Sequence, residues 1–189
     1  MKMGKLVVVT GIDGSGKDYV AQYLHAQDHP SSLISTPTAP FLCARLDIDA
    51  FALTLPAAHY FFYLASVIHA SSIIEQRLIE GNVYCVRYLI DTVAYHRAMG
   101  LPIIIEYETP LYRIRQPDLT VFLNVTDEGI RQERLKTRGK ITVGDHIVNE
   151  EGFRNSLLQE YQRLSEHFVV IDNTHRDIGE VAEEIAHLL

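Results

Sequence analysis

The run GIDGSGKD at residues 11–18 has the spacing of a loop that binds phosphate groups. Gly11, Gly16 and Lys17 occupy the fixed positions of a G-x-x-x-x-G-K-[ST] motif. In such a loop, backbone N–H groups surround phosphate oxygens and the lysine adds a mobile positive charge. The last position holds Asp18, where a hydroxyl that contacts magnesium is usual. The residues expected to contact nucleotide phosphates are Gly11, Asp13, Gly14, Ser15, Gly16, Lys17 and Asp18.

This loop requires a buried strand before it and a helix after it, and the flanking sequence predicts both. The apolar, β-branched run KLVVVT predicts the strand, and helical sequence follows from Lys17. Strand-like runs and helical segments then alternate, which predicts parallel strands joined by right-handed crossovers. The expected strands are 5–10, 32–35, 83–86, 119–125 and 168–171, and the expected helices are 17–26, 56–80, one ending at Met99, 127–138, 149–167 and 177–189, with a polar loop at 139–146. We therefore expect one three-layer α/β domain over residues 1–189, with a five-stranded parallel sheet flanked by helices.

Composition limits the classes of partner. A formal net charge of −7 argues against a broad nucleic-acid surface. Cys43 and Cys85 lack the spacing of metal ligands or of a disulfide framework. No signal peptide and no membrane-spanning segment is expected, so the cytoplasm is the expected location.

Three further stretches resemble the thymidylate kinase family, or a close relative among nucleoside and nucleotide kinases. GNVYCVRYLIDTVAYH resembles the family's strand ending in Asp-Arg-Tyr and the helix carrying Ala-Tyr-Gln. RQPDLTVFLNV resembles its Arg-x-Pro-Asp-Leu-Thr strand. RQERLKTRGK and the later DHIVNEEGFRNSLLQEYQRL resemble its basic lid and the helix behind the lid. The resemblance runs almost end to end and is weaker at 36–58 and 101–114.

This resemblance implies a P-loop kinase fold with a small basic lid at about 134–148, and phosphoryl transfer that uses ATP and Mg²⁺. Lys17, Arg134 and Arg138 would stabilise charge on the transferring phosphoryl group. Asp13 would face the sugar hydroxyl of the acceptor. The ordinary alternatives are a turn-forming role for Asp13 and a solvated basic helix face for the two arginines.

The resemblance also implies an acceptor pocket. Arg87 would bind the acceptor or its phosphate, because a planar guanidinium suits phosphate oxygens. Tyr88, Tyr95 and His96 would line the pocket, His96 standing where the family has Gln. The alternatives are an ordinary ion pair for Arg87, core packing for Tyr88, and a simply packed or solvated His96.

The sequence departs from the family at functional positions. Val86 replaces the Asp of Asp-Arg-Tyr, while Asp18 adds a carboxylate in the phosphate loop. Asp18 could therefore supply the lost magnesium-side carboxylate, since Mg²⁺ prefers oxygen ligands. The alternative is decay of the site, in which both changes mark a protein that no longer catalyses a reaction.

Two arginines of the family are also missing, at the segment STPTAP and at Ser66. A monophosphate dianion needs cationic partners, so a neutral acceptor such as a nucleoside or another hydroxyl compound becomes plausible. Arg45 could replace one of them, although its sequence position does not place it.

These observations predict an ATP-dependent kinase that acts on a nucleotide, a nucleoside or a related small molecule. The first alternative is a catalytically inactive nucleotide-binding pseudo-kinase or regulatory module, and the second is a P-loop nucleotide hydrolase that works as a switch. The expected partner is a small-molecule phosphate acceptor. The apolar helix at 56–80 could supply the face of a homodimer, or it could belong to the core.

Overall fold

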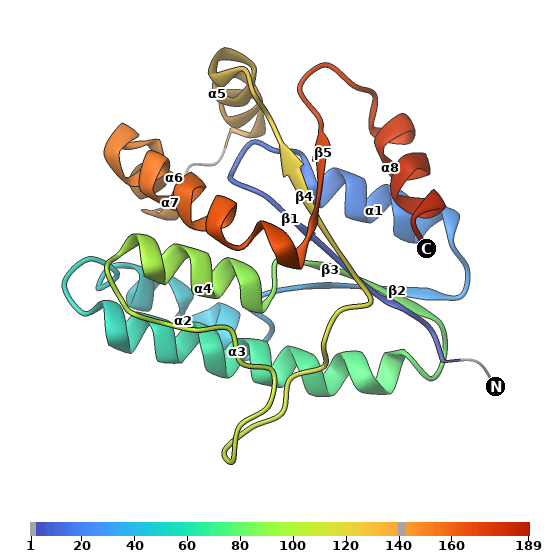
Figure 1. Cartoon of the computed structure of the whole chain (residues 1–189), viewed down its shortest axis with the longest axis horizontal. Helices are drawn as coiled ribbons and strands as arrows, with labels where there is room; N and C mark the ends of the chain where they lie inside the picture. The colour runs from blue at the N-terminus through green and yellow to red at the C-terminus, as the bar shows by residue number, and fades with distance from the viewer. Residues whose placement is uncertain (1–2, 140–142) are drawn as a thin grey trace.

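The computed structural model describes residues 3–139 and 143–189, and an open parallel sheet lies at its centre (Figure 1). The five strands lie in the order β2-β3-β1-β4-β5, and every neighbouring pair is parallel, which confirms the predicted fold class. The strands are β1 (Leu6–Thr10), β2 (Ser31–Ser35), β3 (Asn82–Val86), β4 (Leu119–Asn124) and β5 (Val169–Asp172). The strand before the phosphate loop, β1, is therefore the central strand.

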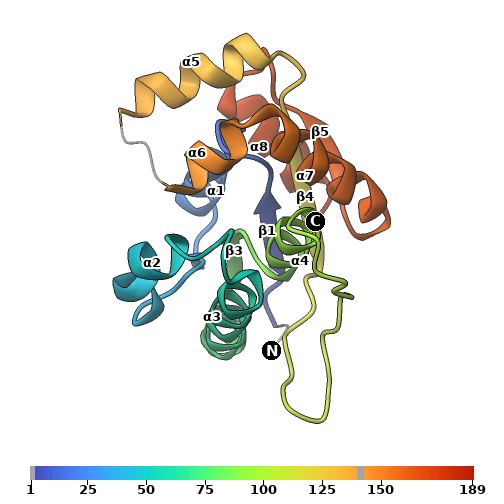
Figure 2. The same ribbon diagram turned by 90° about the vertical axis from the view of Figure 1, so that its left-hand side faces the viewer.

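Helices cover both faces of the sheet and give the molecule three layers (Figures 1 and 2). The helices are α1 (Lys17–Gln27), α2 (Phe41–Asp49), α3 (Pro56–Arg77), α4 (Leu89–Ala98), α5 (Glu128–Arg138), α6 (Val143–Asn149), α7 (Glu151–Arg163) and α8 (Ile178–His187), with a short 3₁₀ helix at Ser165–His167. Buried apolar side chains of α1 and α8 pack on one face of the sheet, and those of α3, α4 and α7 pack on the other.

The apolar side chains of β1 contribute to the hydrophobic clusters on both faces of the sheet. Leu6 and Val8 pack in the cluster with α3, α4 and α7, whereas Val7 and Val9 pack in the cluster with α1 and α8. Successive side chains of a strand point to opposite faces, so a strand covered on both faces is apolar throughout. The same alternation in β3 directs Val86 into the α1 and α8 cluster, where it is 3 % exposed.

Two elements differ from the sequence prediction. No helix is expected at 41–49, but α2 forms there. This helix buries Asp49 and not a stripe of apolar side chains, so its sequence lacks the apolar periodicity that predicts a helix. The polar loop expected over 139–146 is wrong in its second half, because α6 begins at Val143 and buries Ile147 and Val148. Residues 140–142 of the predicted lid lie outside the described residues.

One helix bears on the expectation that no segment spans a membrane. Within the described part of the chain, α3 is long and apolar enough to do so by length and composition alone. A core helix passes the same test, and 39 % of the most apolar window of α3 is buried against the rest of the domain.

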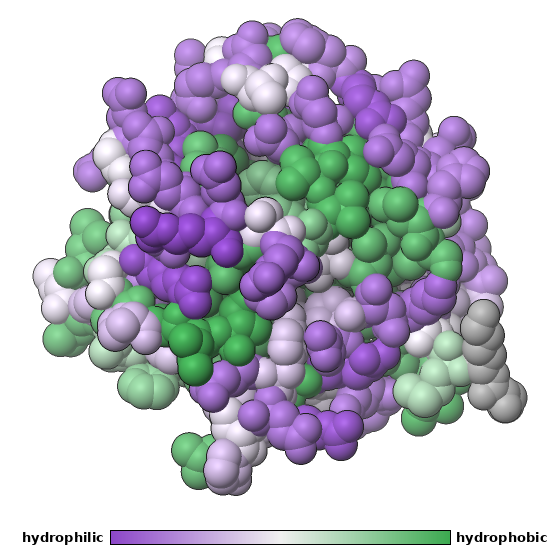
Figure 3. All heavy atoms as spheres, viewed as in Figure 1, coloured by the Kyte–Doolittle hydropathy of each residue, from purple (hydrophilic) through white to green (hydrophobic). Residues whose placement is uncertain are grey.

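The face of the molecule in Figure 3 carries both hydrophilic and apolar side chains. Hydrophilic side chains cover the region of α5 and α7, and apolar side chains gather around β5. Val169 and Val170 are exposed there because β5 is an edge strand of the sheet.

Candidate active site

The phosphate loop joins the end of β1 to the start of α1, as its motif predicts. Gly16 caps α1 with a left-handed backbone (φ 86°), a conformation that glycine adopts without the clash of a Cβ atom. Gly11 and Gly14 also have positive φ values. The unpaired N–H groups of the first turn of α1 therefore face the loop, where a helix N-terminus favours an anion.

Two buried polar atoms at this loop, Ser15 Oγ and Asn173 Oδ1, have no hydrogen-bond partner among the described residues. Ser15 is fully buried, and its Oγ has no hydrogen-bond partner among the described residues. Asn173, directly after β5, donates from Nδ2 to the Ser15 carbonyl at 2.7 Å, while its buried Oδ1 is unpartnered within the same residues. Buried polar atoms are normally satisfied, so these atoms fit a site that a polar ligand completes. The loop residues from Gly11 to Lys17 could thus hold the phosphates of ATP.

Lys17 and Asp13 face each other inside the loop. Lys17 is 3 % exposed, and its Nζ lies 3.3 Å from Oδ1 of Asp13. Arg87, immediately after β3, donates from Nη2 to the same oxygen. Burial alone would raise the pKa of Asp13, but the charges of Arg87 and Lys17 hold it well below its ordinary value. The structure therefore brings three predicted residues together as one charged cluster.

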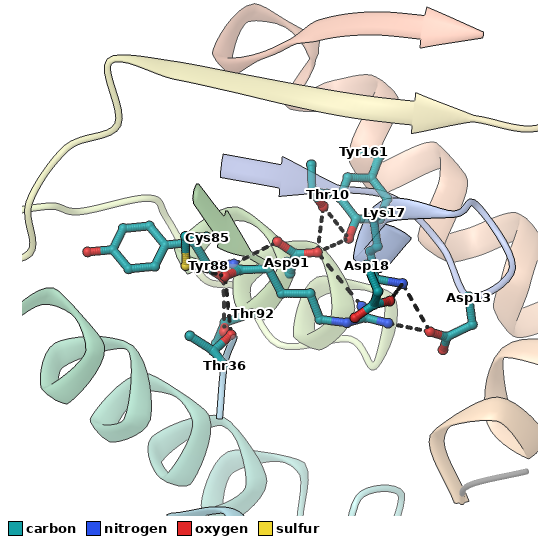
Figure 4. Close-up of polar contacts among 11 residues, drawn as sticks. Thr10, Asp13, Lys17, Asp18, Thr36, Cys85, Tyr88, Asp91, Thr92 and Tyr161 are labelled. Carbon is teal, nitrogen blue, oxygen red and sulfur yellow. Dashed lines mark hydrogen bonds and ion pairs between the residues drawn. The ribbon is translucent and has the colours of Figure 1, made fainter. Parts of the chain in front are cut away.

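A buried carboxylate that the sequence analysis missed lies beside this cluster. Asp91, in the first turn of α4, accepts hydrogen bonds from the hydroxyls of Thr10 and Tyr161 and from the backbone N–H of Tyr88 (Figure 4). Its Oδ1 also lies 3.8 Å from Nη1 of Arg87. Although Val86 removes a carboxylate from β3, Asp91 returns one to the same edge of the sheet from α4.

A pocket opens next to this cluster, between α2, α3, α4 and α7. It is lined by Ile12, Asp13, Thr36, Pro37, Arg45, Asp49, His59, Tyr63, Arg87, Asp91, Thr92, Tyr95, His96, Val148, Leu157 and Tyr161. Of the residues predicted to contact the acceptor, Asp13, Arg87, Tyr95 and His96 therefore share one cavity. The aromatic rings suit a planar organic group, and the charged residues lie toward the phosphate loop.

Tyr88 is not brought to this pocket. Its ring is 1 % exposed and packs in the apolar cluster with α3 and α4. The prediction that Tyr88 lines the pocket is therefore wrong, and core packing describes its position. Tyr88 is the N-cap residue of α4, and Figure 4 shows its ring directed away from Asp13 and Lys17.

Each cation of this pocket already has an acidic neighbour. Arg45 donates from Nε to Oδ2 of Asp49 at 3.2 Å, and its side chain is 34 % exposed. Arg87 is paired with Asp13 and lies close to Asp91. Arg45, which the sequence could not place, is thus a pocket residue, but it is held by its own carboxylate.

The two predicted lid arginines, one turn apart on α5, have different surroundings. Arg134 donates from Nη2 to the carbonyls of Asn173 and Thr174, at 2.8 and 3.1 Å. Arg138, the last residue of α5, is exposed, and its charge helps to lower the pKa of Asp13. Arg138 therefore acts on the charge of Asp13, whereas Arg134 is bound to the loop after β5.

Asp18 is the accessible carboxylate of the phosphate loop. Its side chain is 60 % exposed, and Oδ2 lies 3.9 Å from Nζ of Lys17. No group of three or more His, Cys, Asp or Glu side chains is arranged as a metal site within residues 3–139 and 143–189. Mg²⁺ is commonly held by one or two carboxylates together with substrate phosphates, so Asp18 fits such a ligand.

Arg131 is a further residue that the sequence analysis missed. Its fully buried guanidinium donates to the Asp13 carbonyl at 2.8 Å, to both carboxylate oxygens of Glu128 and to Oδ1 of Asn149. A Cβ at Gly14 would lie 2.7 Å from its Cγ. Arg131 therefore fixes the phosphate loop against α5 and the end of α6.

Comparisons with known proteins point to one family. The family model described as thymidylate kinase matches residues 9–185. A probable thymidylate kinase of Methanocaldococcus jannaschii is 27 % identical over 188 residues, which cover 95 % of this chain and 92 % of that protein. One from Pyrococcus horikoshii is 28 % identical over 202 aligned residues, covering 98 % of this chain and 96 % of that protein.

Solved structures share the fold. Thymidylate kinase from Candida albicans superposes with a TM-score of 0.74 at 20 % identity, covering 98 % of this chain and 91 % of that one. Deoxyadenosine kinase from M. mycoides with bound dATP has a TM-score of 0.69 at 14 % identity, covering 97 % and 98 %. The chain therefore belongs to the thymidylate kinase family and is an ATP-dependent kinase with the P-loop fold.

Proposed function

We propose that this kinase transfers the γ-phosphoryl group of ATP to a hydroxyl group of a neutral acceptor, a nucleoside or a related small molecule. The observation that carries this proposal is the charge pairing of the pocket. Arg45 and Arg87 are each held by a carboxylate that lines the same cavity. A monophosphate dianion would have to separate these pairs and approach Asp13, Asp49 and Asp91, whereas a neutral acceptor would leave them intact.

The residues of the loop support the transfer step. Lys17 and the N–H groups at the start of α1 would hold the phosphates, and Asp18 would bind the Mg²⁺ that accompanies ATP. ATP would supply the phosphoryl group, and Mg²⁺ would neutralise charge that develops during the transfer. Asp13 has a lowered pKa, so it is suited to accept a hydrogen bond from the acceptor hydroxyl and orient it. The acceptor oxygen bonds to the γ-phosphorus as the bond to ADP breaks, and the hydroxyl proton passes to solvent.

The test is ATP consumption with matched acceptors. Each nucleoside is assayed beside its own 5′-monophosphate, starting with thymidine and thymidine monophosphate because the relatives are named as thymidylate kinases. We expect higher kcat/KM for a nucleoside or another neutral hydroxyl compound than for the matched monophosphate. Efficient use of the monophosphate would contradict the neutral acceptor, and no consumption with any acceptor would favour the pseudo-kinase.

A further inference from the structure

A chain of hydrogen bonds crosses the far side of the acceptor pocket and joins α4 to α2 through two histidines. Nδ1 of His96 lies 2.6 Å from the carbonyl oxygen of Thr92. Nε2 of His96 lies 2.7 Å from Nδ1 of His59, and Nε2 of His59 lies 3.2 Å from Oδ1 of Asp49. Asp49, His59 and His96 are all buried, at 5 %, 3 % and 1 % exposure.

The two ends of this chain can only accept hydrogen bonds. The Thr92 carbonyl has no proton to donate. Burial alone would raise the pKa of Asp49, but hydrogen bonds from His59 and Tyr63 and the charge of Arg45 lower it, so Asp49 is a carboxylate. The protons of all three hydrogen bonds must therefore come from the imidazole rings.

Counting protons gives the charge of the pair. Three hydrogen bonds between two acceptor ends need three ring protons, and two neutral imidazoles supply two. The pair must carry one additional proton and one positive charge. Burial lowers the pKa of His96 to about 4, although its bond to the Thr92 carbonyl opposes this, so His96 is neutral at pH 7. His59 is then the ring that donates from both nitrogens.

We propose that His59 and His96 are positioning residues of the acceptor site, whose extra proton holds Asp49 and through it orients Arg45 and Tyr63. Both rings line the pocket, but their nitrogens are engaged with one another, with Asp49 and with the Thr92 carbonyl, so neither ring has a nitrogen free to hydrogen-bond the acceptor. Asp49 receives Nε of Arg45 at 3.2 Å and the hydroxyl of Tyr63 at 2.6 Å, and these two side chains line the pocket. This inference rests on the proposed phosphorylation of an acceptor in that pocket.

The proton should make acceptor use depend on pH. The groups that face the pair are Arg45 and Asp49 from α2, Tyr60 and Tyr63 from α3 and Tyr95 from α4, with Arg87 and Asp13 across the pocket. Without the additional proton only two of the three hydrogen bonds can form, so either the His59–His96 or the His59–Asp49 hydrogen bond is lost. We therefore expect kcat/KM for the acceptor to fall as pH rises, while KM for ATP stays constant.

The matched variant is Asp49→Asn. An amide at residue 49 can donate to Nε2 of His59, so two ring protons then satisfy all three hydrogen bonds and the extra proton is no longer needed. Long-range ¹H–¹⁵N NMR of the full chain counts ring N–H groups at His59 and His96. We expect three in the natural protein near pH 6.5 and two in Asp49→Asn.

Kinetics supply the second measurement. His59→Gln should raise KM for the acceptor by about tenfold or more, because a charge-assisted hydrogen bond to Asp49 is lost. Asp49→Asn should lose the fall of acceptor kcat/KM at higher pH, and His187→Gln, at an exposed position at the end of α8, should retain it.

The outcomes separate this inference from the proposed function. Two ring protons in the natural protein, or an unchanged pH profile in Asp49→Asn, would overturn the inference while acceptor phosphorylation stands. Three ring protons without turnover of any acceptor would overturn the proposed function, and the positioning role with it.

Discussion

Arg87 reaches Asp13 of the phosphate loop from a left-handed backbone (φ 62°), the one such non-glycine residue in the described part of the chain. A residue of this kind costs free energy and persists where its surroundings determine it. Its N–H donates to the Val9 carbonyl at 3.1 Å, and its carbonyl accepts from Thr36 Oγ1 at 3.3 Å. The ends of β1, β2 and β3 thus hold Arg87 in the position from which it controls the charge of Asp13.

Removing this guanidinium should change the pH dependence of the reaction. Arg87 and Lys17 depress the pKa of Asp13 below its ordinary value, so ionised Asp13 persists to low pH. In Arg87→Met the pKa of Asp13 rises, and protonation then begins at a higher pH. We expect the acid limb of the kcat profile to move upward in pH, and an unmoved limb would show that Asp13 ionisation does not limit the reaction.

Lys17→Ala should lose most of the affinity for ATP while the fold remains. Nζ of Lys17 is the buried cation of the phosphate loop, and its removal leaves Asp13 and Asp18 to repel the phosphates. Isothermal calorimetry measures the affinity and circular dichroism checks the fold. Arg77→Ala, at the exposed end of α3, is the control and should bind ATP normally. Unchanged affinity in Lys17→Ala would contradict the claim that this loop binds the phosphates of ATP.

Arg138→Ala should lower kcat far more than it raises KM for ATP. Arginines that stabilise a transferring phosphoryl group can contribute about 10³ in rate. Arg134→Ala should be less severe, because Arg134 is bound to the Asn173 and Thr174 carbonyls. Steady-state kinetics of the two variants make the comparison, and an effect limited to KM would make both of them ordinary binding residues.

Asp18→Thr should lower activity and raise the Mg²⁺ concentration required for half-maximal rate. An oxygen ligand remains, but the carboxylate charge beside the phosphates is lost. A magnesium titration of both proteins measures the shift, with Glu183→Gln, at an exposed position on α8, as the control. Better activity in Asp18→Thr would support decay of the site instead. Adding Val86→Asp to Asp18→Thr would not simply restore the lost carboxylate, because residue 86 lies in the apolar cluster of α1 and α8.

The fold could be predicted wherever local periodicity matched the environment. The apolar run of β1 and the helix beginning at Lys17 were predicted correctly because both faces of β1 are covered and the loop motif marks the start of α1. The helix α2 could not be predicted, because it turns Asp49 inward and leaves Leu42 and Leu46 exposed.

The site was predictable where a contiguous motif marks it, as in the phosphate loop, or where the family resemblance extends, as at Arg87, Tyr95 and His96. The phosphate loop is one run of residues, so its motif identifies it. Asp91 meets Thr10, and Asp49 meets His59, across segments that the chain separates, and no local spacing signals either pair. Tyr88 shows the opposite error, since a residue matching the family's motif is placed in the core.

The most direct test of the account is the affinity of the pocket for a nucleoside and for its own 5′-monophosphate. Calorimetry is done with a non-hydrolysable ATP analogue and Mg²⁺ present, so that binding is measured without turnover. Because Arg45 and Arg87 are already paired with Asp49 and Asp13, we predict that the nucleoside binds at least about tenfold more tightly. Tighter binding of the monophosphate would show that these arginines leave their carboxylates for the acceptor, and would contradict the account.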